Sequence, residues 1–238
     1  MLTEKESNNL ILQSLPQCSK EVLKKLYEYY QLIEQENSKY NLTGFYNEKL
    51  LKEAIIESIL IFLDIEKNIC NLTNKSVLDI GSGAGFPILP YFIYKQDFSL
   101  TIYEPQSKRV NFLNLVKNEL KLKNIDIQKI RAEDSNQIEC FDFISARAVS
   151  ELKNLLEISH HLLKINGIAC FLKSNKYQQE IANSNFIVNK LNINLKTRIL
   201  PIYFNIENVL IFHQKLIKTA PGFPRKWSLI IKNNLKNN

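Results

Sequence analysis

The stretch VLDIGSGAGFP, residues 77–87, decides the fold of this chain. An apolar run ends at Asp79 and Ile80, and three glycines then alternate with small residues. This pattern is typical of a buried parallel strand that turns sharply into a helix beside a ligand, because glycine tolerates positive φ and adds no side chain. In open α/β sheets, ligands bind at the carboxyl ends of the strands. The stretch therefore predicts a ligand site at the end of a first strand.

The glycines of this stretch, Gly81, Gly83 and Gly85, follow a G-x-G-x-G spacing. The fingerprint of dinucleotide-binding folds is G-x-G-x-x-G, so the third glycine comes one residue too early for a nicotinamide enzyme. The stretch resembles the first motif of S-adenosylmethionine (SAM)-dependent methyltransferases. We therefore expect Gly81 and Gly83 to contact this cofactor. The alternative is an ordinary glycine-rich turn.

From residue 76 onward the sequence alternates between strand-like and helix-like patterns. This alternation indicates a doubly wound α/β sheet, because helices cross over between parallel strands. We predict the Rossmann-like fold of class I SAM-dependent methyltransferases, with a seven-stranded, mostly parallel sheet whose last two strands form a hairpin-like pair. The predicted strands are 76–80, 99–104, 125–130, 141–146, 167–173, 194–202 and 208–215. The predicted helices among them are 86–94, 107–120, 151–163 and 177–189.

The first 70 residues are predicted to be helical. Apolar side chains recur at helical spacing after Ser19 and again after Asn47, and we expect both of these residues to be N-caps. We interpret residues 1–70 as a helical extension packed on the sheet. Residues 71–216 would form the SAM-binding methyltransferase domain, and residues 217–238 a basic tail.

Acidic side chains follow the second and third predicted strands. Glu104 ends the strand next to the first, where a carboxylate can accept both hydrogen bonds of a ribose diol. Ala132 and Glu133 lie in the turn after the third strand, which covers the adenine in SAM-dependent methyltransferases, and Phe86 would line the same pocket. The alternatives are a surface glutamate that caps the next helix and an ordinary acidic turn.

The fourth predicted strand ends at residues 145–148, the position that normally faces the methyl group and the substrate. It lacks the Asn/Asp-Pro-Pro-Tyr/Phe motif used on exocyclic amines, and it lacks a cysteine for attack on a pyrimidine carbon. Nitrogen 7 of guanine needs neither, because it carries a lone pair and no proton, and proximity would supply most of the catalysis. Arg147 would contact the cofactor carboxylate or the guanine edge that presents O6 and nitrogen 7. The alternative is a structural salt bridge.

The net charge of the chain is +7, and most of the excess lies near the C-terminus. No acidic residue follows Glu207, whereas these basic residues do: Lys215, Lys218, Arg225, Lys226, Lys232 and Lys236. Such a segment suits a polyanionic partner, because each phosphate contact releases counterions. The alternative is a solvated tail that keeps the protein soluble.

The remaining composition narrows the class of protein. Four scattered cysteines without a C-x-x-C pair indicate reduced thiols rather than a disulfide or zinc framework. No apolar run reaches the length of a membrane span, and the N-terminus does not read as a signal peptide. We therefore expect a cytoplasmic protein with no metal site and no membrane partner.

Several further motifs resemble one family when they are taken with the glycine stretch. Residues 40–43 (YNLT), 108–113 (KRVNFL), 145–148 (SARA) and 172–173 (LK) occur in the same order as in the bacterial 16S ribosomal RNA guanine-7 methyltransferases, the RsmG/GidB family. The resemblance covers about residues 20–215. It implies a SAM-binding, Rossmann-like enzyme that methylates nitrogen 7 of one guanine in the 530 loop of the small-subunit RNA.

The resemblance also implies roles for individual residues. The cofactor contacts would include Gly81, Phe86, Ala132, Glu133 and Arg147. The residues that act at the reacting base would be Arg147 and Lys173. The RNA would be held by Arg109, Lys173, Arg225 and Lys226. Trp227, which follows them, is expected to dock on the domain rather than to stack on a base. The partner would be 16S ribosomal RNA or the small subunit, and we expect a monomer.

Two positions depart from the family pattern. The helix after Asn47 usually carries an Arg-His pair and an Asp-Ser pair, whereas here residues 53–54 are Glu-Ala and residues 57–58 are Glu-Ser. The missing histidine removes one candidate contact to RNA or cofactor. Two alternatives therefore stay open. One is a SAM-dependent methyltransferase with another substrate, and the other is a ribosome-assembly or RNA-binding factor that keeps the fold without turnover.

Overall fold

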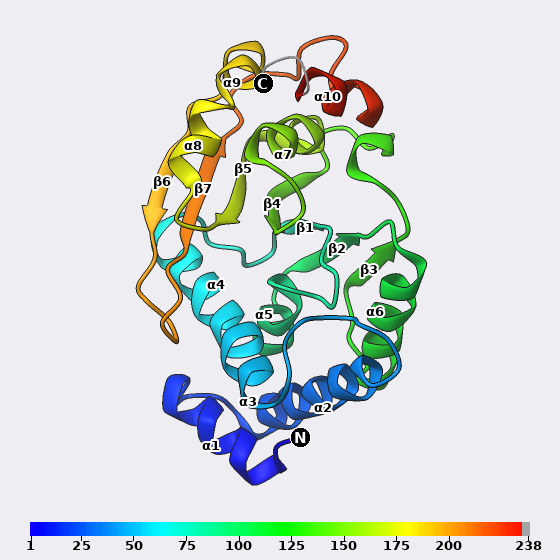
Figure 1. Ribbon diagram of the computed structural model, residues 1–238, viewed down its shortest axis with the longest axis vertical. Helices are drawn as coiled ribbons and strands as arrows, with labels where there is room; N and C mark the ends of the chain where they lie inside the picture. Colours follow the sequence, from blue (N-terminus) through cyan, green and yellow to red (C-terminus); the bar gives the residue numbers. More distant parts are fainter. Residues whose placement is uncertain (235–238) are drawn as a thin grey trace.

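A seven-stranded sheet runs through the computed structural model, which describes residues 1–234 (Figure 1). The strand order is β3-β2-β1-β4-β5-β7-β6. Neighbouring strands from β3 to β5 are parallel, and β7 is antiparallel to both β5 and β6. The strands are β1 (Ser76–Ile80), β2 (Ser99–Tyr103), β3 (Ile125–Gln128), β4 (Phe141–Arg147), β5 (Leu163–Lys173), β6 (Lys196–Ile199) and β7 (Val209–Gln214). This arrangement confirms the predicted fold class and its closing pair.

Helices cover both faces of the sheet. In Figure 1, α2, α4, α5 and α6 lie below the sheet and α7 to α10 lie above it. The helices are α1 (Glu4–Ser14), α2 (Lys20–Asn37), α3 (Asn47–Lys49), the π-helical η1 (Leu50–Ile56), α4 (Glu57–Asn68), α5 (Ile88–Tyr94), α6 (Ser107–Glu119), the 3-10 turn η2 (Ala132–Asp134), α7 (Leu152–His160), α8 (Tyr177–Ala182), α9 (Asn185–Lys190) and α10 (Trp227–Asn234). Within residues 1–234, no helix is long and apolar enough to cross a membrane.

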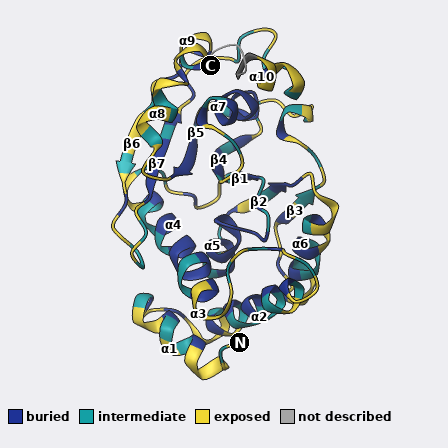
Figure 2. Ribbon diagram, viewed as in Figure 1, coloured by how far each residue is buried: buried dark blue, intermediate teal, exposed yellow. Residues whose placement is uncertain are grey.

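Alternate side chains of the central strands enter two separate cores, because successive residues of a strand face opposite sides of the sheet. Val77 and Phe143 pack against the N-terminal helices, α5 and α6, whereas Leu78 and Ile144 pack beneath α7. Figure 2 shows the central strands and the inner sides of these helices as buried. Burial on both faces explains why the strands read as nearly continuous apolar runs.

The N-terminal helices share a core with the sheet. Side chains of α1, α2 and α4 pack in one cluster with those of β1, β2 and β4. Ser19 is the N-cap of α2, as predicted, since its side chain accepts a hydrogen bond from the Val22 amide. Helix α1, which the sequence patterns did not single out, begins with a capping box between Thr3 and Glu6.

Two helix predictions are wrong in detail. Asn47 is not a cap, because Tyr46 occupies the N-cap position and Asn47 is the first residue of α3, with a φ of 50°. The helix predicted over residues 177–189 is two short helices. Ser184 lies at the break, where its hydroxyl donates a hydrogen bond to the Glu180 carbonyl at 2.6 Å. Such local side-chain bonds compete with the regular helix ladder.

The C-terminal segment is partly docked. The Nζ of Lys215 is fully buried and donates to Glu139 at 3.1 Å and to two backbone carbonyls at 2.9 Å. The guanidinium of Arg225 makes two hydrogen bonds to the buried carboxylate of Glu157. These two cations serve the fold, and the predicted contact of Arg225 with RNA stays a prediction. Lys236, another member of that segment, lies outside the described residues.

Candidate active site

The glycine stretch forms the turn between β1 and α5. Gly81, Gly83 and Gly85 have φ values of 70°, 61° and 107°, which glycine adopts without the strain that a Cβ imposes. Gly85 also lacks room for a side chain, because a Cβ there would lie 2.7 Å from both Leu89 Cδ2 and Tyr29 Oη. The predicted strand, sharp turn and helix are all present.

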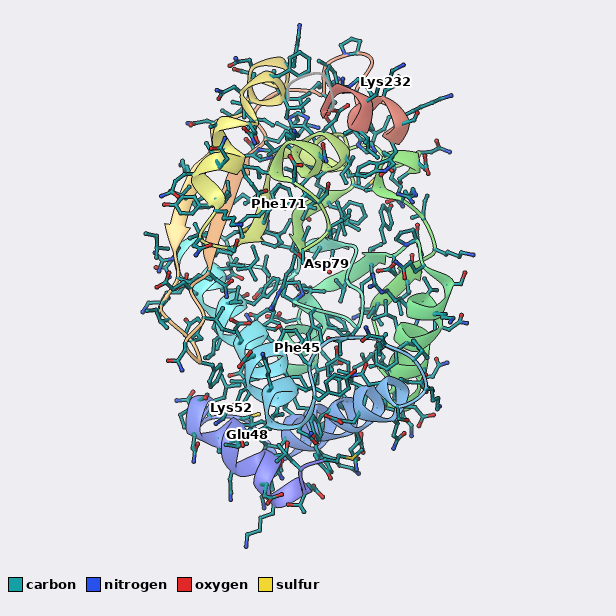
Figure 3. All side chains as sticks on the ribbon, viewed as in Figure 1. Phe45, Glu48, Lys52, Asp79, Phe171 and Lys232 are labelled. Atoms are coloured by element: carbon teal, nitrogen blue, oxygen red, sulfur yellow. The ribbon has the colours of Figure 1, made fainter. Side chains whose placement is uncertain are left out.

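Asp79 ties this turn to the sheet. It is fully buried near the centre of the molecule (Figure 3). Its carboxylate accepts hydrogen bonds from Ser82 in the turn and from Ser145 on β4, the latter at 2.6 Å. Burial raises the pKa of Asp79 to about 7, against the lowering effect of the two serine hydroxyls. Asp79 thus couples the cofactor turn to the strand that carries Arg147.

The N-terminal helices support the turn from the other side. Tyr29 of α2 is fully buried, and its hydroxyl donates to the Ala84 carbonyl at 2.6 Å. The Phe86 ring lies 6.1 Å from the Tyr29 ring and 6.5 Å from the Phe45 ring. Phe86 therefore belongs to this aromatic cluster. It is not among the residues that line the two cavities described next, and its predicted role in the adenine pocket stays a prediction.

A first cavity, of about 250 Å³, opens at the ends of β1, β2 and β3. It brings together residues of three predicted strand ends, namely Gly81, Glu104, Ala132 and Glu133. The Glu104 carboxylate also holds the neighbouring turns, because its two oxygens accept the amides of Gly83 and Gln106, each at 3.0 Å. Glu104 thus both lines the cavity and anchors the start of α6.

One carboxylate oxygen at this cavity is left without a hydrogen bond. Oε1 of Glu133 is buried and has no hydrogen-bond partner within the described part of the chain. Its nearest cation is Arg131, with Nη1 at 3.8 Å. Burial raises the pKa of Glu133. A buried acceptor of this kind costs free energy unless a ligand donor completes it, so the cavity fits a ligand with an amine or hydroxyl group.

Two further residues at the first cavity come from outside the glycine motif. Arg109 of α6 lines this cavity, with Nη1 3.9 Å from Oε2 of Glu104. Trp227 of α10 also lines the cavity, and the guanidinium of Arg131 lies 5.9 Å from its ring. Trp227 is docked on the domain, as expected, but sequence reasoning did not place it at the cofactor cavity. Lys226 beside it is exposed.

A second cavity, of about 430 Å³, adjoins the first at the ends of β4 and β5. Ala148 and Val149 line both cavities. Arg147 and Lys173, the two residues predicted to act at the reacting base, line the second one. The strand order thus brings the two predicted residues together beside the predicted cofactor contacts.

Arg147 is held by a buried carboxylate. Its Nη1 lies 3.2 Å from Oε2 of Glu57, and the other oxygen of Glu57 accepts a hydrogen bond from Asn208 at 2.8 Å. Burial raises the pKa of Glu57, while Arg147 and Asn208 lower it. The guanidinium also lies 6.0 Å from the Phe45 ring. Arg147 therefore forms the structural salt bridge that was the alternative reading, and it lines the cavity as well.

Lys173, like Arg147, is paired with a carboxylate. Its Nζ lies 2.6 Å from Oε2 of Glu180 and donates to the Ser150 carbonyl at 2.8 Å. The Lys173 side chain is only 8% exposed. Neither Glu57 nor Glu180 was predicted to be a site residue. Glu57 was noted only for its place at the family's Asp-Ser pair, and no sequence signal indicated the contact of either carboxylate with its cation.

Comparison with known proteins identifies the family. The family model for GidB, rRNA small subunit methyltransferase G, matches residues 22–198. The chain belongs to this family. The ribosomal RNA small subunit methyltransferase G of Malacoplasma penetrans is 38% identical over 97% of this chain and 98% of its own length. The enzyme of the same name from Mesoplasma florum is 35% identical over 92% of each chain.

Solved structures agree on the fold. The crystal structure of a SAM-dependent methyltransferase from Aquifex aeolicus covers 67% of this chain and 92% of its own, with a TM-score of 0.53 and 19% identity. At that identity the likeness is one of fold alone. The Rossmann-like fold of class I methyltransferases and the resemblance to the RsmG/GidB family are both confirmed.

Proposed function

We propose that this protein transfers a methyl group from SAM to nitrogen 7 of a guanine in the 530 loop of 16S ribosomal RNA. The observation that carries the proposal is the pair of adjoining cavities, one at the ends of β1 to β3 and one at the ends of β4 and β5. A methyl transfer needs two ligands side by side, and Ala148 and Val149 line both cavities. Family membership supplies the RNA class of the substrate.

SAM would occupy the first cavity. Glu104 would accept the ribose hydroxyls, and the unpaired Oε1 of Glu133 would accept the adenine amine. The positive φ of Gly81 and Gly83 keeps their backbone free of side chains where the cofactor approaches. Trp227 and Arg109 would close the open edge of the site.

The reaction needs orientation rather than a base. SAM supplies a methyl carbon on a positively charged sulfur, and nitrogen 7 bonds to that carbon while the carbon–sulfur electron pair returns to sulfur. No proton leaves nitrogen 7, and Arg147 cannot accept one. The residues of this chain therefore act by holding the base in line, which can supply most of the rate enhancement.

The charges of the second cavity suit this reaction. Arg147 and Lys173 are each paired with a carboxylate, Glu57 and Glu180. Positive charge passes from sulfur to the purine during the transfer. An unpaired cation would repel the positive charge that develops on the purine. Cations that are paired with carboxylates still donate hydrogen bonds but add no net charge to the site.

The proposal predicts distinct losses for two variants of Arg147. Arg147→Ala should lower methyl transfer by about 100-fold or more, as removal of one aligned electrostatic contact typically does. Arg147→Lys keeps the charge but loses the planar fork, so it should recover only part of the rate. Single-turnover rates and SAM titrations would measure both. Full activity in Arg147→Ala would contradict the assignment of Arg147.

A further inference from the structure

The second cavity contains a hydrogen-bonding pair that the methyl transfer itself does not require. Lys173 ends β5, and Glu180 lies on α8, which follows it. Both residues line the cavity that adjoins the cofactor site. In the proposed reaction this cavity holds the target base, so any polar group fixed in it meets the edge of that base.

The pair is rigid. Oε2 of Glu180 accepts hydrogen bonds from Lys173 Nζ at 2.6 Å and from the Leu152 amide at 2.7 Å. Lys173 Nζ also donates to the Ser150 carbonyl at 2.8 Å. Both charged groups are therefore fixed by backbone as well as by each other, and fixed groups discriminate between ligands better than mobile ones.

The pair has one unused donor and one unused acceptor. An ammonium has three protons, and Lys173 uses two of them, on Ser150 and Glu180. Oε1 of Glu180 has no hydrogen-bond partner among residues 1–234. The remaining N–H of Lys173 and Oε1 of Glu180 thus belong to two hydrogen-bonded groups whose residues both line the cavity.

The geometry points to Lys173 and Glu180 as the pair that selects guanine, a role that rests on the proposed function. Guanine presents O6, an acceptor, directly beside N1–H, a donor, and its N7 lies on the O6 side. Lys173 would donate to O6 and Glu180 would accept from N1–H, which leaves N7 unblocked. Adenine presents a donor and then an acceptor in the same positions. It would match the pair only when reversed, with its N7 turned away from the methyl group.

The contact of Glu180 with N1–H would strengthen as the reaction proceeds. The purine gains positive charge when nitrogen 7 takes the methyl group, so its N1–H becomes a better donor to a carboxylate. Interactions that are stronger in the transition state than in the ground state raise kcat. A variant without this carboxylate should therefore lose kcat more than it loses RNA affinity.

A purely structural role for Glu180 makes a different prediction. Its bond to the Leu152 amide caps the first turn of α7. Loss of a cap lowers stability but does not depend on which base is being methylated. The identity of the base therefore separates the two roles.

The test combines a protein change with a base change. Glu180→Gln keeps the shape but loses the charge, and Glu119→Gln makes the same change at the exposed C-terminal end of α6, away from the strand ends. Small subunits would be reassembled with guanine or 2-aminopurine at the target position, since 2-aminopurine keeps N7 but lacks O6 and N1–H. The rate of methyl transfer, the SAM affinity and the melting temperature would be measured for each combination.

We expect Glu180→Gln to lower the rate on guanine by about 10- to 100-fold, in line with the discrimination supplied by a paired base-edge contact. On 2-aminopurine the wild-type protein should already be slow, and Glu180→Gln should change its rate little. Glu119→Gln should match the wild type on both bases. An equal loss on the two bases, or no loss on guanine, would overturn the assignment.

A second measurement needs no variant and covers the case in which Glu180→Gln fails to fold. Inosine keeps O6, N1–H and N7 and lacks only the 2-amino group. The wild-type protein should methylate inosine nearly as fast as guanine, and 2-aminopurine much more slowly. Equal rates on all three bases would overturn the assignment of the pair alone, whereas no 7-methylguanosine from the guanine substrate would overturn the proposed function itself.

Discussion

At the scale of single residues, the site depends on carboxylates whose partners the sequence did not identify. Asp79, Glu57 and Glu180 each hold a turn or a cation near the two cavities. Some of their partners are distant in the sequence: Glu57 and Arg147 are 90 residues apart, and Asp79 and Ser145 are 66 apart. The strand order did predict that Glu104, Ala132 and Glu133 lie close together, because the carboxyl ends of neighbouring parallel strands meet at one edge of the sheet. Their contacts with the cofactor stay predictions.

The glycine turn provides the first prediction at this scale. Gly83 has a φ of 61°, and its amide donates to Glu104. Gly83→Asp should abolish SAM binding and keep the fold, because it adds backbone strain and a second negative charge beside Glu104. Gly83→Ala is the matched control, since a Cβ has room there, 3.9 Å from Arg109, and only the strain remains. Calorimetric SAM titration and circular dichroism would measure both; normal SAM affinity in Gly83→Asp would remove the proposed pocket.

The pH dependence of stability provides the second prediction at the scale of single residues. Burial raises the pKa of Asp79 to about 7 from an ordinary 3.8. Between these values the folded chain holds a proton that the unfolded chain has released, so this contribution to stability is full below pH 3.8 and is lost as the pH rises through 7. Between pH 5 and pH 8 the wild type should lose about 2–3 kcal/mol relative to Asp79→Asn, which cannot ionise. Urea denaturation at the two pH values would measure this, and parallel pH curves for the two proteins would count against it.

At the scale of elements, the N-terminal helices are part of the site's framework. Tyr29 of α2 contacts the glycine turn through the Ala84 carbonyl. The ring of Phe45, in the loop before α3, lies 6.5 Å from the Phe86 ring and 6.0 Å from the Arg147 guanidinium. Figure 3 places Phe45 in the same central region of the molecule as Asp79. The helical extension therefore holds the turn in position as well as covering one face of the sheet.

Removing the Tyr29 hydroxyl tests whether α2 holds the glycine turn in position. Tyr29→Phe leaves the Ala84 carbonyl buried without its partner, which should cost about 1–3 kcal/mol of stability and weaken SAM binding. Tyr27→Phe is the control on the same helix, because the Tyr27 hydroxyl bonds to the Leu2 carbonyl, far from the turn. Chemical denaturation and SAM titration would be compared for both. Equal effects of the two variants on SAM affinity would show that the contact with the turn has no special role.

The sequence predicted elements best where periodicity was strong. The bounds of β1 were predicted correctly, and those of β2, β4 and α6 were nearly so, because buried runs between turn signals leave few alternatives. The break between α8 and α9 and the π-helical turn before Glu57 were missed. Both depend on local hydrogen bonding that hydrophobic patterns do not encode.

At the scale of the whole molecule, the basic C-terminal segment divides into structural and exposed charges. Arg225→Ala should destabilise the protein by about 3 kcal/mol, because it leaves the buried Glu157 carboxylate without its cation. Lys226→Ala should leave stability unchanged and weaken RNA binding, with a shallower dependence of affinity on salt. Thermal melts and RNA titrations at several salt concentrations would separate the two roles. A stable Arg225→Ala protein with weaker RNA binding would restore Arg225 as an RNA contact.

The central claim is that the protein binds SAM and the target base in its two adjoining cavities and methylates nitrogen 7 of one guanine in the small subunit. Its most direct test is transfer from methyl-labelled SAM to small subunits that lack the modification, followed by identification of the labelled nucleoside and its position. We predict label in 7-methylguanosine within the 530 loop. Label in another nucleoside, or none despite measured SAM binding, would contradict the claim.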